Sequence, residues 1–178
     1  MKIAAFLTLA VVCCVEVSAA SAQAIPNNPL IYEKWQIGVG GSLVNPDYTD
    51  SAIPGYMVYG TYSPIRFFGL EAKTRYAYKG NGEREFSISG GYRFSLPLNR
   101  CEPFVGALIG YGHFSDAITS VVGNGNNSLV ISFLGGLDVR ATRHVNVRLF
   151  EVESQAWTDF PPNGLGPVAY SAGVAYRP

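Results

Sequence analysis

Residues 70–79 read LEAKTRYAYK and residues 84–94 read REFSISGGYRF, and polar and apolar side chains alternate in both runs. In the first run, Glu71, Lys73 and Arg75 take odd positions, and mostly apolar or aromatic residues take the even ones. Only a β-strand sends successive side chains to opposite faces. The intervening Gly-Asn-Gly is a turn signal. The two runs therefore predict a β-hairpin with one apolar, aromatic-rich face and one face that carries charges of both signs.

Residues 1–24 have the features of a secretory signal peptide. Lys2 precedes an apolar run over residues 3–15, and Ala22-Gln23-Ala24 is a small-x-small cleavage site. We therefore expect a mature chain that begins near Ile25. No later stretch approaches the ~18 continuous apolar residues that a membrane-spanning helix requires. The rest of the chain has a length that suits one domain.

The charge and the reactive side chains exclude several classes of function. The chain has 13 basic and 13 acidic residues, and a neutral balance gives no electrostatic footprint for nucleic acid. Two histidines and one mature cysteine, Cys101, do not make a metal site, and Cys101 has no internal partner for a disulfide. No glycine-rich segment leads into a predicted helix that would hold a phosphate. We expect no metal, no cofactor and no nucleic-acid partner.

The remaining residues predict an all-β domain over residues 25–178. The chain has 20 glycines, 11 tyrosines and 10 phenylalanines, spread through short alternating runs without a helical period. We expect eight strands, at residues 35–43, 53–62, 66–79, 84–95, 103–114, 128–140, 145–157 and 167–177. Each has roughly the 9–11 residues that cross a bilayer at a tilt, or slightly more. The predicted fold is an eight-stranded antiparallel up-and-down transmembrane β-barrel.

The connections between these strands fall into two sets. One set lies at residues 63–65, 96–102 and 141–144, and the other at 45–52, 80–83, 115–127 and 158–166. Three of the four segments in the second set are longer and rich in Gly, Asn, Asp and Pro. Short turns at one end and longer loops at the other are typical of outer-membrane barrels, whose long loops face outside the cell. The pattern predicts localisation in the outer membrane of a Gram-negative bacterium.

The polar face of the terminal strands is also their small face. These small or polar residues are Gln36, Gly38, Gly40 and Ser42 in the first strand, and Ala169, Ser171, Gly173 and Ala175 in the last. The interior of an eight-stranded barrel is just filled by side chains, so small residues there leave room for a few long charged ones. This favours a membrane barrel with its polar face inward. The alternative is a soluble periplasmic ligand-binding barrel, which would place the same apolar face inward.

Aromatic residues gather near the predicted strand ends. They are Trp35, Tyr62, Tyr76, Tyr78, Phe94, Trp157 and Tyr176. Such positions suit aromatic girdles at the two lipid–water interfaces.

Charged residues of both signs fall on the predicted inward positions. The acidic and basic candidates are Glu71, Glu85, Asp138, Glu151 and Glu153, and Lys73, Arg75, Arg93, Arg140 and Arg148. A buried charge without a partner costs several kcal/mol, so these groups must pair. Their balance predicts a closed lumen with a salt-bridge network, because wide pores of the porin type have ~16–18 strands.

The alternation changes phase within residues 145–157. Arg148 lies at an even position, whereas Glu151 and Glu153 lie at odd ones. Both sets can face one lumen only after a one-residue slip, which predicts a β-bulge near Leu149-Phe150. In the alternative, Arg148 lies outside and reaches the periplasmic headgroups. The glycines of residues 103–114 favour an inward even side, and the facing of residues 53–62 stays open.

These residues resemble the small OmpA/OmpX-type outer-membrane β-barrel family over the whole mature chain. The most specific stretch is Arg143-His144-Val145-Asn146-Val147-Arg148, followed by Glu151, Glu153, Gln155, Trp157 and Phe160. The resemblance implies insertion into the outer membrane by the barrel assembly machinery, contact with outer-membrane lipid and lipopolysaccharide, and no catalytic residue. Members of that family usually end in an aromatic residue, whereas this chain ends in Tyr176-Arg177-Pro178.

An enzymatic alternative depends on His113-Phe114-Ser115. Some outer-membrane barrels that hydrolyse lipid A use a His-x-Ser pair with a Glu that orients the histidine, and this segment has that spacing. The next Glu is Glu151, in another predicted strand. We therefore expect no catalytic residue and a structural or surface-interaction role. A lipid A-modifying hydrolase is the alternative, and the partner of the outer loops is open.

Overall fold

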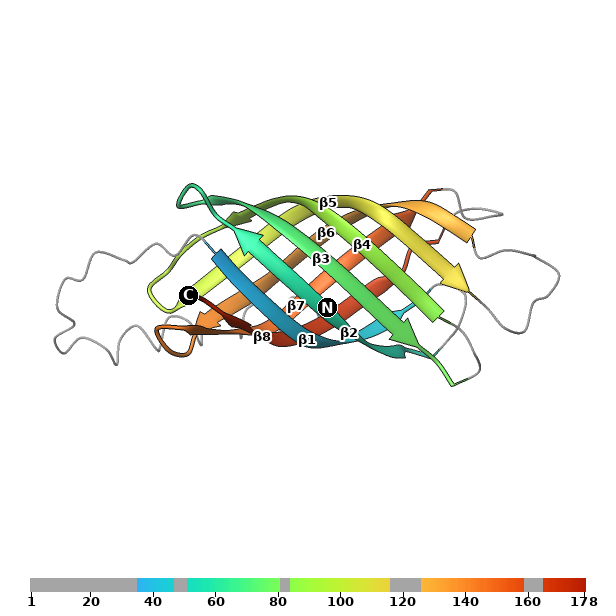
Figure 1. Cartoon of the computed structure of the whole chain (residues 1–178), viewed down its shortest axis with the longest axis horizontal. Coiled ribbons are helices and arrows are strands. Elements are labelled where there is room, and N and C mark those ends of the chain that lie inside the picture. The colour runs from blue at the N-terminus through green and yellow to red at the C-terminus, as the bar shows by residue number, and fades with distance from the viewer. Residues whose placement is uncertain (1–34, 47–50, 81–83, 116–125, 159–164) are drawn as a thin grey trace, which may run out of the picture. The chain divides into compact units, whose positions relative to one another are not determined.

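The computed structural model describes residues 35–46, 51–80, 84–115, 126–158 and 165–178. The predicted signal peptide, its cleavage site and most of the longer loops lie outside these residues. Within them, eight antiparallel strands close into one barrel, in which each strand pairs with its neighbours in sequence and β8 pairs with β1 (Figure 1). The predicted fold class is confirmed.

The strands follow the predicted segments closely. They are β1 (Trp35–Asn45), β2 (Ile53–Tyr62), β3 (Phe68–Tyr78), β4 (Arg84–Ser95), β5 (Cys101–Ser115), β6 (Asn126–Arg140), β7 (Val145–Trp157) and β8 (Val168–Tyr176). Three of them, β2, β4 and β7, begin and end at the predicted residues, and the other bounds differ by one or two. Within the described residues, no helix is long and apolar enough to cross a membrane.

The barrel closes along a seam of small residues. In the pairing of β1 with β8, Gly40 lies opposite Gly173 and Ser42 lies opposite Ser171. A Cβ atom on Gly173 would come within 2.5 Å of the backbone oxygen of Val39. The close approach of the two strands therefore requires glycine at this position.

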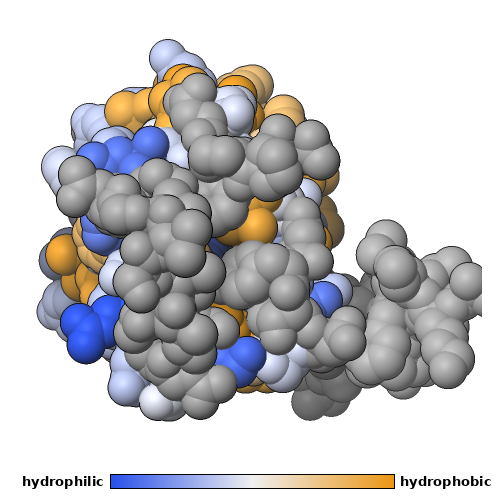
Figure 2. All heavy atoms as spheres, turned by 90° about the vertical axis from the view of Figure 1, so that its right-hand side faces the viewer, coloured by the Kyte–Doolittle hydropathy of each residue, from blue (hydrophilic) through white to orange (hydrophobic). Residues whose placement is uncertain are grey.

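The inward and outward faces agree with the membrane orientation. The outer wall carries large hydrophobic side chains such as Ile37, Val105 and Phe133, which are 66%, 58% and 66% exposed, whereas Glu71 and Arg93 are each 1% exposed. Hydrophobic residues also form much of the visible outer edge at the top of the end-on view in Figure 2. A soluble barrel would have the opposite arrangement. The exterior is therefore built to contact lipid.

β7 contains the predicted β-bulge. Its pairing with β6 passes from Phe150 opposite Leu137 to Arg148 opposite Asp138, which leaves Leu149 as the extra residue. Leu149 and Phe150 are both exposed on the outer wall, at 53% and 41%. Arg148 is buried inside the barrel, so the alternative that placed it outside is wrong.

The structure also settles the two strands with weak polar faces. In β5 the even side faces inward, as predicted, with Phe104 and Leu108 buried. In β2 the odd side faces inward, with Met57 and Tyr59 almost completely buried. Trp157 corrects one interpretation, since it is 1% exposed and lies inside the barrel rather than in an outer girdle. It continues the inward odd side of β7 that begins at Glu151.

Candidate functional site

Eight charged side chains meet in the interior of the barrel, and we call them the lumen network. The acids are Glu71, Asp138, Glu151 and Glu153, and the bases are Lys73, Arg75, Arg93 and Arg148. They come from β3, β4, β6 and β7, and each is less than 5% exposed. Since four acids face four bases, the formal charges of the network cancel.

Arg148 contacts three carboxylates of this network and two aromatic rings. Its Nε donates to Asp138 at 2.9 Å, and its Nη1 donates to Glu71 at 3.3 Å and also to Glu151. The guanidinium carbon lies 3.8 Å from the ring centre of Tyr59 and 4.5 Å from that of Phe104. One cation therefore links three carboxylates and contacts two aromatic faces, where it gains cation–π attraction.

Arg93 occupies an adjacent place beside Phe104. Its Nη1 donates to Glu71 at 3.0 Å, and its Nη2 donates to Asp138 at 2.8 Å. The guanidinium carbon lies 3.8 Å from the ring centre of Phe104. Arg93 and Arg148 thus share two carboxylates, and this pairing offsets the desolvation of both cations.

Lys73 and Arg75 project from β3 toward β7. The Nζ of Lys73 lies 2.6 Å from Glu151, 3.0 Å from Glu153 and 3.3 Å from Glu71. The Nη2 of Arg75 donates to Glu153 at 2.9 Å. β3 and β7 are four strands apart in a barrel of eight, so they lie on opposite walls. These ion pairs therefore join the two walls across the lumen.

A chain of hydrogen bonds leads from the network toward the rim that carries the longer loops. The Nε2 of Gln155 donates to Glu153 at 2.7 Å, and the Nε1 of Trp157 donates to Oε1 of Gln155 at 3.0 Å. Trp157 then packs with Val130 and Leu165 in an apolar cluster. The hydrogen bond to Gln155 offsets the cost of removing the indole N–H from water.

Polar side chains fill the lumen near the opposite rim. The Nδ2 of Asn146 donates to Gln36 at 3.0 Å, and Nε2 of Gln36 donates to Thr61 at 3.2 Å. The Nη1 of Arg177 donates to Asn146 at 3.2 Å. Within the described residues, the lumen network therefore lies between the apolar cluster around Trp157 and a group of uncharged polar side chains that Arg177 contacts.

Two of the ten predicted lumen residues lie apart from this network. Glu85 is 5% exposed and lies at the start of β4. Arg140 is half-buried at the end of β6, and within the described residues its side chain has no ion pair. Tyr59 and Phe104 were not predicted as partners of the charges, although the glycines on the even side of β5 already indicated that Phe104 faces inward.

The His-x-Ser segment does not form a catalytic arrangement within the described residues. Nδ1 of His113 lies 2.8 Å from Oδ1 of Asn127, and this contact is exposed. Among the described residues, His113 has no carboxylate partner, and no cluster of His, Cys, Asp and Glu could hold a metal ion. His144 lies elsewhere, with Nδ1 3.1 Å from the backbone oxygen of Arg177.

The chain is similar in structure to known outer-membrane proteins. No protein-family model and no curated protein matches its sequence. Neisserial surface protein A (NspA) is 12% identical, with a TM-score of 0.67 over 81% of this chain and 97% of that protein. The attachment invasion locus protein Ail of Yersinia pestis is 16% identical, with a TM-score of 0.52 over 82% of this chain and 98% of Ail.

The outer membrane enzyme PagL has the same fold. It is 17% identical to this chain, with a TM-score of 0.50 over 78% of this chain and 97% of PagL. At these identities the likeness shows the fold alone. The chain therefore has the fold of the small eight-stranded outer-membrane barrels of the OmpA/OmpX type, and its apolar outer wall suits a bilayer.

Proposed function

We propose that this protein is a small integral outer-membrane β-barrel with a structural or surface-interaction role, and that the lumen network plugs its interior. The single observation that carries the plug is the ion pairing between opposite walls, where Lys73 lies 2.6 Å from Glu151 and 3.0 Å from Glu153. A solute that crossed the lumen would have to separate these charges.

Separation of the buried pairs is unfavourable. Removal of one partner from a buried ion pair typically costs about 3–5 kcal/mol, because the other charge stays buried without compensation. In the lumen network most groups have two or three partners, so one broken contact leaves the remaining ones in place. This arrangement supports a closed barrel rather than a selective pore.

The proposal includes an orientation and a set of partners. The start of β1 and the end of β8 lie at one rim, where Ile37 pairs with Tyr176, and the longer loops lie at the other. The longer loops then face the outside, as in outer-membrane barrels in general. The partners are outer-membrane lipid, lipopolysaccharide and, during insertion, the barrel assembly machinery. Ail is named for attachment and invasion, which supports a surface-interaction role for the loops.

Cell fractionation followed by an unboiled gel tests the proposal. We expect the protein in the detergent-soluble outer-membrane fraction, with a migration that changes on boiling because the folded barrel resists the detergent. Release of the protein with the periplasmic fraction would overturn the proposal in favour of a soluble ligand-binding barrel.

The hydrolase alternative has a separate test. The fold of PagL is compatible with an enzyme, but His113 contacts Asn127 and not a carboxylate. A histidine base needs an orienting partner to activate a hydroxyl. We expect mass spectra of lipid A to be unchanged after overexpression of the protein. Altered lipid A that returns to normal in the His113→Ala variant would establish the alternative.

A further inference from the structure

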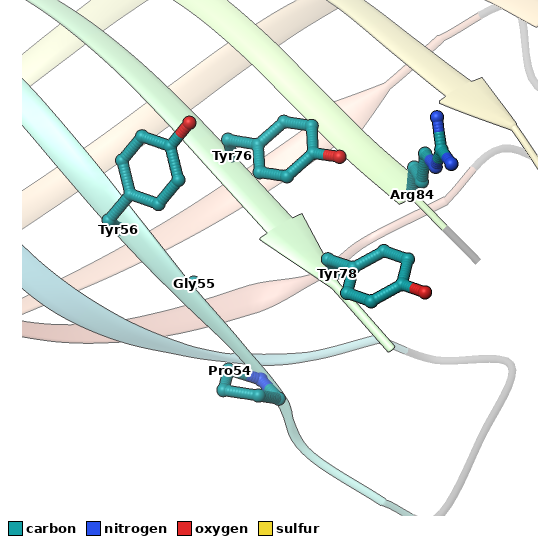
Figure 3. Close-up of a pocket in the computed structure, with 6 residues that line it drawn as sticks. All are labelled: Pro54, Gly55, Tyr56, Tyr76, Tyr78 and Arg84. Carbon is teal, nitrogen blue, oxygen red and sulfur yellow. The ribbon is translucent and has the colours of Figure 1, made fainter. Parts of the chain in front are cut away.

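A hollow of about 570 Å³ lies on the outer wall of the barrel. Its lining comes from three neighbouring strands and consists of Pro54, Gly55, Tyr56, Tyr76, Tyr78 and Arg84. Tyr56 pairs with Tyr76, and Tyr78 pairs with Arg84 two positions further along β3, so the lining residues lie close together near the end of β3 (Figure 3). This volume is within the range of about 300–1,000 Å³ that small-molecule sites occupy.

The floor of the hollow is aromatic. The ring centres of Tyr56 and Tyr76 are 5.6 Å apart with an interplanar angle of 36°. Tyr56 and Tyr78 are 58% and 44% exposed, so both side chains are accessible to a ligand. On the lipid-facing side of a barrel, such a surface is complementary to a hydrocarbon chain, and tyrosine rings favour the level of the headgroups.

A cation lies at the edge of this floor. The guanidinium carbon of Arg84 is 5.8 Å from the ring centre of Tyr78, and Arg84 is exposed. The next residue, Glu85, points into the barrel, and within the described residues Arg84 has no ion pair. A guanidinium group binds phosphate through parallel hydrogen bonds. The hollow therefore combines an apolar floor with an anion-binding edge.

We propose that this hollow binds lipid A, the phosphorylated and multiply acylated anchor of lipopolysaccharide, with an acyl chain over Tyr56 and Tyr76 and a phosphate at Arg84. The inference rests on the proposed function. With the longer loops facing outside, Arg84 lies at the level of the outer headgroups, where lipid A is the phosphorylated lipid. Charge complementarity selects a phosphate at the edge, and the aromatic floor selects an acyl chain beside it.

Native mass spectrometry of the folded full-length protein in detergent tests this site. We expect lipid A to bind, and Arg84→Gln to weaken that binding about tenfold or more, since the substitution removes a charge-assisted hydrogen bond to phosphate. Arg66→Gln is the matched control, because Arg66 is also exposed and lies 5.4 Å from the ring centre of Phe67, at the other rim. That control should bind lipid A as the wild type does.

A second pair of variants tests the aromatic floor. Tyr56→Ser should weaken lipid A binding, whereas Tyr170→Ser, at an outward position of β8 with 53% exposure, should leave it unchanged. Equal affinity of Arg84→Gln and the wild type would overturn the site. Equal binding of dephosphorylated lipid A or of phosphatidylglycerol would overturn the choice of ligand.

An unboiled gel of the same samples separates the two possible failures. If the protein keeps its heat-dependent migration but does not retain lipid A, only the lipid site is wrong. If the migration does not change on boiling, the membrane-barrel proposal itself fails.

Discussion

The guanidinium group of Arg148 contacts three carboxylates, which belong to β3, β6 and β7. Its substitution by methionine keeps much of the side-chain volume but removes the charge. We expect Arg148→Met to lower the free energy of unfolding by about 3–5 kcal/mol, because Asp138 and Glu71 then lose part of their compensation. Urea unfolding of the protein in lipid vesicles measures this change.

Arg143→Met is the control for that experiment. Arg143 is exposed in the turn between β6 and β7, and surface substitutions usually change stability by less than about 0.5 kcal/mol. Equal losses in the two variants would show that the buried ion pairs do not contribute to stability.

Two glycines, Gly110 and Gly41, have opposite surroundings. A Cβ atom on Gly110 would overlap the backbone oxygen of Ile88 in the neighbouring strand, whereas a Cβ on Gly41 would have no atom within 4 Å. We expect Gly110→Val to destabilise the barrel by about 1–3 kcal/mol, as overpacking does. Gly41→Val should leave it unchanged within about 0.5 kcal/mol. The same urea titration distinguishes them, and a tolerated Gly110→Val would contradict the close pairing of β4 with β5.

At the scale of the element, the bulge in β7 lets the strand keep all its charges inside. Arg148 and Glu151 both face inward although three positions separate them, because Leu149 and Phe150 both face outward. Deletion of Leu149 would restore simple alternation without turning any charge outward. We expect this deletion variant to fold and to show heat-dependent migration on gels.

Deletion of Thr74 is the matched comparison. Thr74 separates Lys73 from Arg75 in the regular strand β3, so its loss makes these two residues adjacent. One of them would then face lipid, since a one-residue slip sends side chains to the other face. This variant should not fold, and its migration on gels should not change on boiling. The bulge argument would be wrong if both deletions had the same effect.

The facing of a strand could be predicted where its two sides differ in polarity. Lys73 and Arg75 against Leu70 and Tyr78 leave one choice, and the slip in β7 followed from the same reasoning. β2 gave no such contrast, because inward Met57 and outward Val58 are both apolar. Periodicity carries no information about facing when both sides are apolar.

The partners within the lumen could not be predicted from single strands. The contact of Lys73 with Glu151 depends on how far β3 and β7 are staggered along the barrel, which the shear of all the strands determines. The inward position of Trp157 could be predicted from the sequence, because Trp157 continues the odd side of Glu153 and Gln155. At this position the alternation of the strand outweighs the general preference of aromatic residues for interfacial girdles.

At the scale of the whole molecule, the character of the buried side chains changes along the barrel. Side chains of Val44, Ile53, Ala77 and Ala169 form an apolar cluster near the rim with the longer loops. The lumen network lies next to it, and Gln36, Thr61 and Asn146 follow toward the other rim. The outer wall carries large apolar side chains, whereas the lumen network places charged ones inside. This arrangement requires pairing of every central charge.

The proposed plug of the lumen predicts that the protein does not conduct ions. We expect no stepwise current when the wild-type protein is inserted in a planar bilayer, because ion pairs such as Lys73 with Glu151 join opposite walls. A porin of ~16–18 strands, which leaves an aqueous channel, serves as the positive control. Replacement of both Lys73 and Glu151 by alanine removes one such cross-lumen pair and should raise the leak current above that of the wild type. Regular conductance steps in the wild type would refute the plug. An unchanged leak current in the double variant would instead assign the closure to the apolar cluster around Trp157.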